Sequence, residues 1–200
     1  MPRRLEGKIA IITGGSQGYG QGIVTKFRQE GAEVVIGDIS DAKGTEVAGN
    51  LGCTFVHADV TQQSDWQKML ETAVSQYGGL DIIVNNAGYC NSPTSTGDVE
   101  DVDFDKMVDV NMKSLRLSTG VTIPYLLSQT KPAAFVNVAS ACAKRPRPGL
   151  TWYGASKAAI ANAVGAMALE YAPNQIRLNT VNPAAGLTNM WVVTIISLTQ

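Results

Sequence analysis

Thr13-Gly14-Gly15-Ser16-Gln17-Gly18-Tyr19-Gly20 is a glycine-rich turn near the start of the chain. It follows an apolar, β-rich run at 8–13 and precedes a helical pattern that contains Ile23 and Phe27. Glycines permit positive φ angles and let a pyrophosphate approach the backbone, and the free N–H groups at a helix start favour its negative charge. A strand, a glycine turn and a helix in this order predict a dinucleotide-binding βα unit.

Apolar runs bounded by turn residues alternate with helical stretches along the rest of the chain. This alternation is the pattern of repeated βα units and a parallel sheet. We expect strands at 8–13, 32–38, 53–58, 80–85, 133–140 and 176–181, with sheet-covering helices between them. The predicted fold class is α/β, a doubly wound parallel sheet of the Rossmann-like type.

Length and charge narrow the class of protein. The chain has 200 residues, of which 44% are hydrophobic, and neither a linker nor a repeat divides it, so we expect a single domain over 1–200. Lys and Arg number 16 against 17 Asp and Glu, and the net charge of -1 does not favour nucleic acid or an anionic membrane as a partner. A small molecule is the expected partner.

The first residues and the cysteines bear on the compartment. The basic start is followed by Leu5-Glu6-Gly7-Lys8 rather than by an apolar run, so we expect no signal peptide, and no run approaches the length of a membrane span. Cys53, Cys90 and Cys142 are widely spaced and odd in number, which argues against a disulfide framework or a zinc site. These features favour a cytoplasmic protein without a metal.

Asp38 closes the second expected strand and follows Gly37. In this kind of fold, a carboxylate at that place lies at the adenosine ribose, where it accepts hydrogen bonds from both hydroxyls and repels a 2′-phosphate. Neither Gln17 nor residues 39–40 offer a cation for such a phosphate. NAD(H) is therefore the preferred cofactor over NADP(H); the alternative is that Asp38 only caps the next turn.

Tyr153 and Lys157 are four residues apart, so on a helix they project from one face. A nearby ammonium stabilises a phenolate, and we expect Lys157 to lower the pKa of Tyr153 from about 10 toward the working range of an acid/base catalyst. Alone, the pair would indicate only a helix surface. Ser140 changes this interpretation because it ends an expected strand at the edge where open α/β sheets bind ligands.

Further motifs follow the glycine spacing Gly14-x-x-x-Gly18-x-Gly20 in a fixed order. They are Asp59-Val60, Asn85-Asn86-Ala87-Gly88, Asn111, Ser140 and Tyr153-Gly154-Ala155-Ser156-Lys157. With these motifs, the sequence from Leu5 to Met190 resembles the short-chain dehydrogenase/reductase family, in its short single-domain branch. The resemblance implies an oxidoreductase that transfers hydride between NAD(H) and a secondary alcohol or ketone.

The resemblance also implies residue roles. Tyr153 would exchange a proton with the substrate oxygen, Ser140 would hold that oxygen, and Lys157 would hydrogen-bond the nicotinamide ribose. Asn111 would hold a water that relays protons through Lys157; a satisfied structural amide is the alternative. The cofactor-binding residues implied are Gly14, Ser16, Gln17, Gly18, Tyr19, Asp38, Asp59, Val60, Asn86, Ala87, Gly88, Tyr153, Lys157, Pro183 and Thr188. Asn85 and Asn86 serve either the cofactor or the turn after their strand.

The sequence departs from the family at three places. Ala184 stands after Pro183 where a glycine is usual, and its methyl group would crowd the nicotinamide or restrict the turn. Tyr19 replaces a smaller aliphatic residue. Residues 191–200 form an atypical tail whose apolar part, 192–198, does not read as a substrate-covering helix, so we expect a C-terminally shortened fold. The alternative function is a truncated, weak or inactive NAD(H)-binding protein.

Other readings carry less weight. The family pairs the helices that begin near Phe104 and Trp152, which implies a homo-oligomer, either a dimer or a tetramer. A hydrolase with Ser140 as nucleophile lacks a base, because the only histidine, His57, lies in another strand. We expect no metal at His57 and a solvated loop at Lys144-Arg145-Pro146-Arg147-Pro148.

Overall fold

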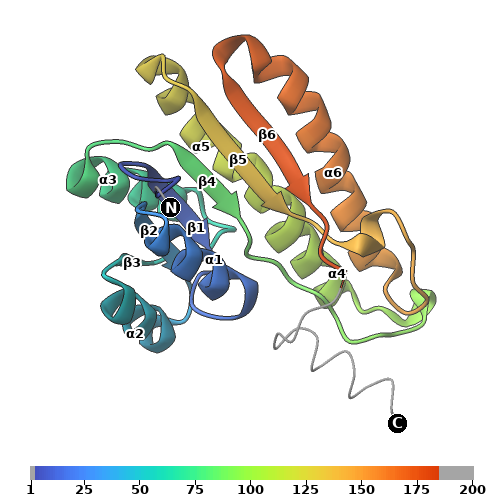
Figure 1. Ribbon diagram of the computed structural model, residues 1–200. Helices are drawn as coiled ribbons and strands as arrows, with labels where there is room; N and C mark the ends of the chain where they lie inside the picture. The colour runs from blue at the N-terminus through green and yellow to red at the C-terminus, as the bar shows by residue number, and fades with distance from the viewer. Residues whose placement is uncertain (1–2, 185–200) are drawn as a thin grey trace.

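The computed structural model describes residues 3–184, which form one parallel sheet with helices on both faces (Figure 1). The strands are β1 (Ile9–Thr13), β2 (Glu33–Asp38), β3 (Thr54–His57), β4 (Ile82–Asn85), β5 (Ala133–Val138) and β6 (Ile176–Val181). Their order in the sheet is β3-β2-β1-β4-β5-β6, and every pair is parallel. This order is that of the doubly wound Rossmann-like fold and confirms the predicted fold class.

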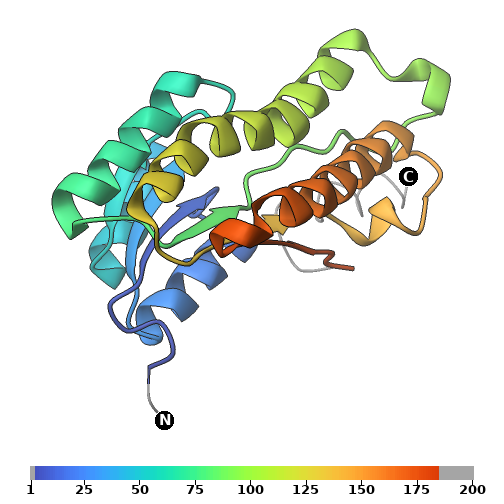
Figure 2. The same cartoon turned by 90° about the horizontal axis from the view of Figure 1, so that it is seen from above.

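Helices connect successive strands. They are α1 (Gly18–Gln29), α2 (Asp41–Leu51), α3 (Gln63–Tyr77), α4 (Asp101–Met107), the π-helix η2 (Val108–Lys113), α5 (Ser114–Gln129) and α6 (Thr151–Tyr171). Short 3-10 turns lie at η1 (Thr96–Asp98), η3 (Ala141–Ala143) and η4 (Ala172–Asn174). Figure 2 shows α3, α5 and α6 on one side of the sheet and α1 on the other.

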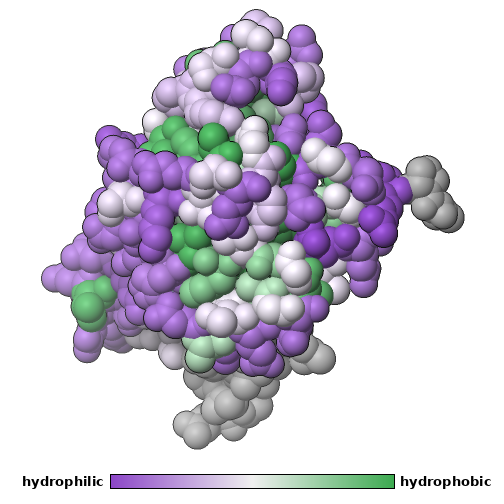
Figure 3. Space-filling model, turned by 90° about the vertical axis from the view of Figure 1, so that its left-hand side faces the viewer, coloured by the Kyte–Doolittle hydropathy of each residue, from purple (hydrophilic) through white to green (hydrophobic). Residues whose placement is uncertain are grey.

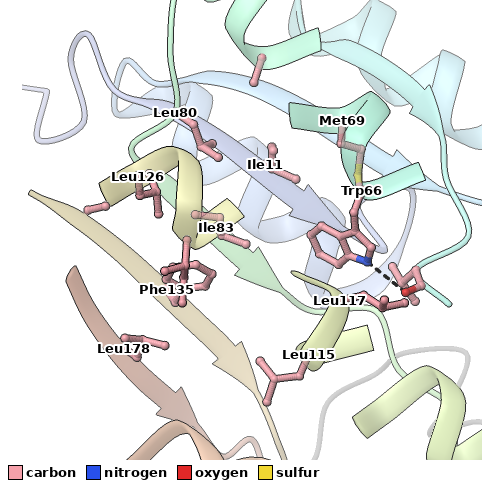
Figure 4. Packing of buried hydrophobic residues seen from close by; sticks show 14 of the residues in the cluster. Ile11, Trp66, Met69, Leu80, Ile83, Leu115, Leu117, Leu126, Phe135 and Leu178 are labelled. Carbon is pink, nitrogen blue, oxygen red and sulfur yellow. Dashed lines mark hydrogen bonds between the residues drawn. The ribbon is translucent and has the colours of Figure 1, made fainter. Parts of the chain in front are cut away.

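Alternate side chains of each strand supply the two cores. Ile11 and Ile83 face α3, α5 and α6, whereas Ala10 and Ile12 face α1 and α2. In the larger core, the Trp66 indole packs among aliphatic side chains and its Nε1 donates to the Val60 carbonyl at 3.0 Å (Figure 4). Strands buried on both faces explain the continuous apolar runs in the sequence.

The carboxyl ends of the strands meet at one edge of the sheet. Thr13 is paired with Gly37, Asn85 with Asn137 and Val138 with Val181. From β1, the strands β2 and β3 extend to one side of the sheet and β4, β5 and β6 to the other, so the strand order changes direction between β1 and β4. Ligands of open α/β sheets bind at such a switch point. The register therefore brings the loops after β1, β2, β4 and β5 together.

Some expectations need adjustment. The strand expected at 133–140 ends at Val138, and Ser140 is instead the N-cap of η3. The helical segment expected between the strands at 80–85 and 133–140 is not one α-helix, because η2 lies between α4 and α5. The expected tail at 191–200 lies outside the described residues.

The side of the molecule at the β3 edge is mostly hydrophilic, with apolar residues exposed in small separate patches (Figure 3). Over residues 3–184, no helix is both long and apolar enough to span a membrane.

Candidate active site

A cleft of about 340 Å³ lies along the carboxyl edge of the sheet. Most of the residues implied by the sequence line it, although they come from separate segments of the chain. They are Gly14, Gln17, Gly18, Tyr19, Asp38, Asp59, Val60, Asn86, Ala87, Gly88, Ser140, Tyr153, Lys157 and Pro183. Ser16 and Asn111 lie behind this lining, and Thr188 lies outside the described residues.

The glycine turn forms one end of the cleft. Gly14 and Gly18 have φ angles of 65° and 55°, in the left-handed region that favours glycine. A Cβ atom on Gly20 would collide with the Gly14 carbonyl oxygen, and one on Gly14 would lie 2.9 Å from Asn86 Nδ2. The cradle thus admits a ligand close to the backbone only because these positions carry no side chain, which fits a pyrophosphate.

Asn86 fixes this turn from the neighbouring strand. Its Nδ2 donates to the carbonyl oxygens of Thr13 at 2.9 Å and Gly14 at 3.2 Å. The Thr13 hydroxyl in turn accepts from the N–H groups of Asn86 and Ala87, both at 3.1 Å. Asn86 therefore stabilises the turn, as one of its two expected roles required, and it also lines the cleft; its contact with a cofactor stays a prediction.

Asp38 has two structural partners as well as a place in the cleft lining. Its Oδ2 accepts from the Ser16 hydroxyl at 2.6 Å and from Ser16 N at 3.1 Å, and its Oδ1 accepts from Ser40 N at 3.0 Å. Asp38 thus caps the next turn through its bond with Ser40 N, as the alternative expected. Ser16 uses its hydroxyl on Asp38, which explains why it does not line the cleft.

Asp59 and Val60 follow β3 and line the same end of the cleft as Asp38. Asp59 Oδ1 accepts from the N–H and the hydroxyl of Thr61 at 2.9 and 2.8 Å, and Asp59 N donates to Asp65 at 2.8 Å. These bonds fix the loop and leave the Val60 side chain, buried at 6% exposure, as apolar wall.

Tyr153, Ser140 and Lys157 gather at the other end. All three are buried, at 8%, 7% and 3% exposure. Lys157 Nζ lies 5.8 Å from the centroid of the Tyr153 ring and donates to the Val138 carbonyl at 3.1 Å. The Ser140 hydroxyl accepts from Cys142 N at 3.2 Å, which leaves its own proton for another acceptor.

The expected lowering of the Tyr153 pKa is wrong in this structure. Burial raises the pKa of Tyr153 to about 12, and a hydrogen bond with Ser140 offsets part of that rise. Burial also lowers the pKa of Lys157 to about 8, because the interior disfavours the ammonium. Four-residue spacing correctly placed the two groups together, but it carried no information about their desolvation.

Asn111 is a satisfied amide within the π-helix η2 and is 2% exposed. Its Oδ1 accepts from Tyr89 N at 2.9 Å, and its Nδ2 donates to the Tyr89 carbonyl at 2.9 Å and to the Ser156 hydroxyl at 3.0 Å. The side chain joins the loop after β4 to α6, the helix of Tyr153. Its structural role is therefore plain, and the water relay remains a proposal.

Several lining residues were missed from the sequence. At the Tyr153 end they include Cys90, Ala139, Cys142, Arg147 and Leu150. Arg147 was assigned to a solvated loop, and it is indeed exposed, but it also borders the cleft. Its place in the segment between Ser140 and Tyr153 was the available signal.

Three other positions that the sequence singled out are His57, Pro183 and Ala184. His57 pairs with Asp41 through Nδ1 at 2.8 Å on an exposed surface. Pro183 and Ala184 line the cleft after β6, and the Pro183 carbonyl accepts from Ala141 N at 2.9 Å. Ala184 is thus part of the cleft wall, and the crowding of a nicotinamide by its methyl group stays a prediction.

Known proteins are similar to this chain in sequence and in fold. The profile of the short chain dehydrogenase family matches residues 8–195. One relative is 4-formylbenzenesulfonate dehydrogenase of Comamonas testosteroni, which is 37% identical over 93% of this chain and 75% of that protein. Another is 3-alpha-(or 20-beta)-hydroxysteroid dehydrogenase of Mycobacterium tuberculosis, which is 34% identical over 96% of this chain and 75% of that protein. The structure of 3-ketoacyl-(acyl-carrier-protein) reductase from Brucella melitensis complexed with NADH is similar, with a TM-score of 0.93, 38% identity, and coverage of 96% of this chain and 81% of that one. The chain therefore belongs to the short-chain dehydrogenase family.

Proposed function

We propose that this member of the family interconverts a secondary alcohol and a ketone with NAD(H) as its preferred cofactor. The observation that carries the proposal is the single cleft that joins the glycine cradle and Asp38 to Tyr153, Ser140 and Lys157. A cradle alone would indicate a binding protein, and a buried tyrosine alone would indicate packing. Their convergence in one cleft supports a reaction in which Tyr153 acts as acid or base beside a bound dinucleotide.

The glycine turn would hold the pyrophosphate against backbone N–H groups at the start of α1. Asp38 would accept hydrogen bonds from the adenosine ribose through lone pairs that Ser16 and Ser40 leave free. Val60 and Ala87 would supply apolar contacts along the same groove. When bound, the nicotinamide cofactor supplies or accepts the hydride.

Tyr153 would move the proton. With its pKa raised to about 12, the phenol is protonated at neutral pH and is ready to donate to a substrate oxygen in the direction of reduction. The Ser140 hydroxyl, which bonds to Tyr153 in this structure, would donate a second hydrogen bond to the substrate oxygen when substrate is bound. The Lys157 ammonium would then return a proton to the Tyr153 phenolate. The lowered pKa of Lys157, about 8, makes release of this proton easier.

The relatives' names cite 4-formylbenzenesulfonate, borneol and hydroxysteroids. This range supports an alcohol or a carbonyl compound as substrate and does not select one compound.

Transfer of deuterium tests the proposal directly. The chain is incubated with NADH deuterated at C4 of the nicotinamide and with a panel of ketones, and the alcohols formed are examined by mass spectrometry. We expect deuterium on the carbinol carbon for at least one ketone. Fluorescence titration showing tight NADH binding, with no labelled product over the whole panel, would instead support the alternative of a cofactor-binding protein.

A further inference from the structure

The Tyr153 end of the cleft is positively charged. Among the described residues that line the cleft, the carboxylates are Asp38 and Asp59, and both lie at the end formed by the loops after β2 and β3. The cations in the lining are Lys157 and Arg147. Lys157 is buried beside Tyr153 and belongs to the catalytic group, so Arg147 is a charge that the proposed reaction does not use.

Arg147 stands on an anchored loop. Pro146 and Pro148 flank it and restrict the backbone on both sides, and its carbonyl accepts from Leu150 N at 3.2 Å. The next turn is held to the loop after β4, because the Gly149 carbonyl accepts from Thr94 N at 3.0 Å. The backbone that carries Arg147 is thus held beside the start of α6, and the Arg147 side chain borders the cleft from there.

The Arg147 guanidinium has no partner among the residues that the structure describes. Within residues 3–184, no carboxylate pairs with it and no hydrogen-bond acceptor contacts it, whereas Arg28 is bound to Glu33 and Arg4 to Glu30. An arginine offers planar donors that suit a carboxylate or another oxyanion. An exposed arginine without a partner at the mouth of a cleft therefore fits an anionic group on a ligand.

Apolar side chains lie between this cation and the catalytic group. Cys142 and Leu150 are buried with Tyr153 in one small cluster, and Cys90 packs against it. Burial raises the pKa of Cys90 to about 12, so the thiol is neutral at physiological pH. A ligand at this end would contact apolar wall along its body and a positive charge at the rim.

We propose that Arg147 is a specificity-determining residue that favours substrates with an anionic group, such as a carboxylate, on an apolar body. The inference rests on the proposed function, since it places the carbonyl of the same molecule at Ser140 and Tyr153. A second source of anion is the pyrophosphate of the cofactor. Arg147 belongs to the segment between Ser140 and Tyr153 rather than to the Gly14–Gly20 turn, which favours the substrate as the source of the anion.

Binding of an unreactive pair tests the charge without any need for turnover. Calorimetry compares 4-ethylbenzoate with its neutral counterpart 4-ethylbenzamide on the chain saturated with NADH. We expect the benzoate to bind about tenfold more tightly, a preference that Arg147→Gln abolishes and Arg147→Lys partly retains. Arg145→Gln is the matched control, because Arg145 is an exposed cation of the same loop outside the cleft lining.

Equal binding of the two compounds by the wild-type chain, or a preference that survives in Arg147→Gln, would overturn the proposal. NADH affinity separates the two anion sources. We expect Arg147→Gln to leave the Kd of NADH unchanged; a loss as large as the loss of benzoate affinity would assign Arg147 to the pyrophosphate and contradict the proposal.

Turnover provides the second readout. With 4-acetylbenzoate and 4-acetylbenzamide as ketones, we expect Arg147→Gln to raise KM for the benzoate about tenfold with little change in kcat, and to leave the amide unaffected. If neither ketone turns over but benzoate binding still depends on Arg147, the proposed reaction is at fault and the anion site stands.

Discussion

At the scale of single residues, spacing identified the catalytic group but not its protonation. Tyr153 and Lys157 are four residues apart in the sequence, and the structure places them together. Which way their pKa values move depends on burial, and burial depends on β5, η3 and α6 packing around them. No local pattern in the sequence encodes that packing, which is why the expected sign for Tyr153 was wrong.

The raised pKa of Tyr153 predicts a pH dependence. Oxidation of an alcohol needs the phenolate, and the fraction of phenolate rises with pH everywhere below the pKa of about 12. We expect kcat for alcohol oxidation to rise by up to about tenfold per pH unit between about pH 6 and pH 9. Reduction uses the protonated phenol, so its kcat should not rise over that range. Steady-state assays in both directions check this; an oxidation rate that is flat from pH 6 would contradict it.

Asp38 is expected to set cofactor preference. Calorimetry on the wild-type chain should give a lower Kd for NADH than for NADPH, because the carboxylate would repel a 2′-phosphate. Asp38→Asn removes the charge. We expect it to raise the Kd of NADH by about tenfold or more and to bring the Kd values of NADH and NADPH closer together. Glu46→Gln, an exposed carboxylate of α2, is the control. Tighter binding of NADPH by the wild-type chain would refute the preference.

At the scale of elements, the strands were predictable because buried parallel strands are continuous apolar runs bounded by turn residues. Their predicted limits differ from the observed ones by a few residues, since fraying at strand ends leaves no clear mark in the sequence. The π-helix η2 was not predicted. In this region Phe104, Val108, Asn111 and Leu115 follow one another at steps of three or four residues, as in an α-helix. One extra residue in a helical turn does not disturb so short a pattern.

Asn111 is expected to hold η2, the loop after β4 and α6 together. Asn111→Leu removes three hydrogen bonds and leaves both main-chain groups of Tyr89 unpaired. We expect a loss of about 2–4 kcal/mol in the free energy of unfolding, measured by urea denaturation, together with weaker NADH binding. Ser118→Ala is the matched control, because the buried Ser118 hydroxyl has no hydrogen-bond partner in the described part of the chain and should be dispensable. Equal free energies of unfolding for the two variants would contradict the structural role of Asn111.

At the scale of the whole molecule, the order of strands explains why residues far apart in the sequence share one cleft. The motif order in the chain was enough to predict the fold and most of the lining. Arg147 and Cys142 were missed because the loop after β5 has no fixed pattern, and only the folded chain shows which of its side chains turn toward Tyr153. The residues after 184, including Thr188, keep the status of predictions.

Exposed apolar side chains of α4 and α6 support the proposed homo-oligomer. Val102 and Leu169 are 67% and 81% exposed, and Phe104 contacts Trp152 edge to face at a centroid distance of 5.4 Å. We expect sedimentation to show a dimer or a larger species. Leu169→Asp should shift it toward monomer, whereas Thr45→Asp on the exposed face of α2 should not. A wild-type chain that sediments only as monomer would contradict the expectation.

The central claim is that Tyr153 exchanges the proton while the rest of the cleft binds the cofactor. Its most direct test is Tyr153→Phe, which deletes one hydroxyl, measured by kcat for NADH-dependent ketone reduction together with the Kd of NADH. We predict a fall in kcat of about 100-fold or more with an unchanged Kd. A variant that keeps the kcat of the wild-type chain would contradict the account.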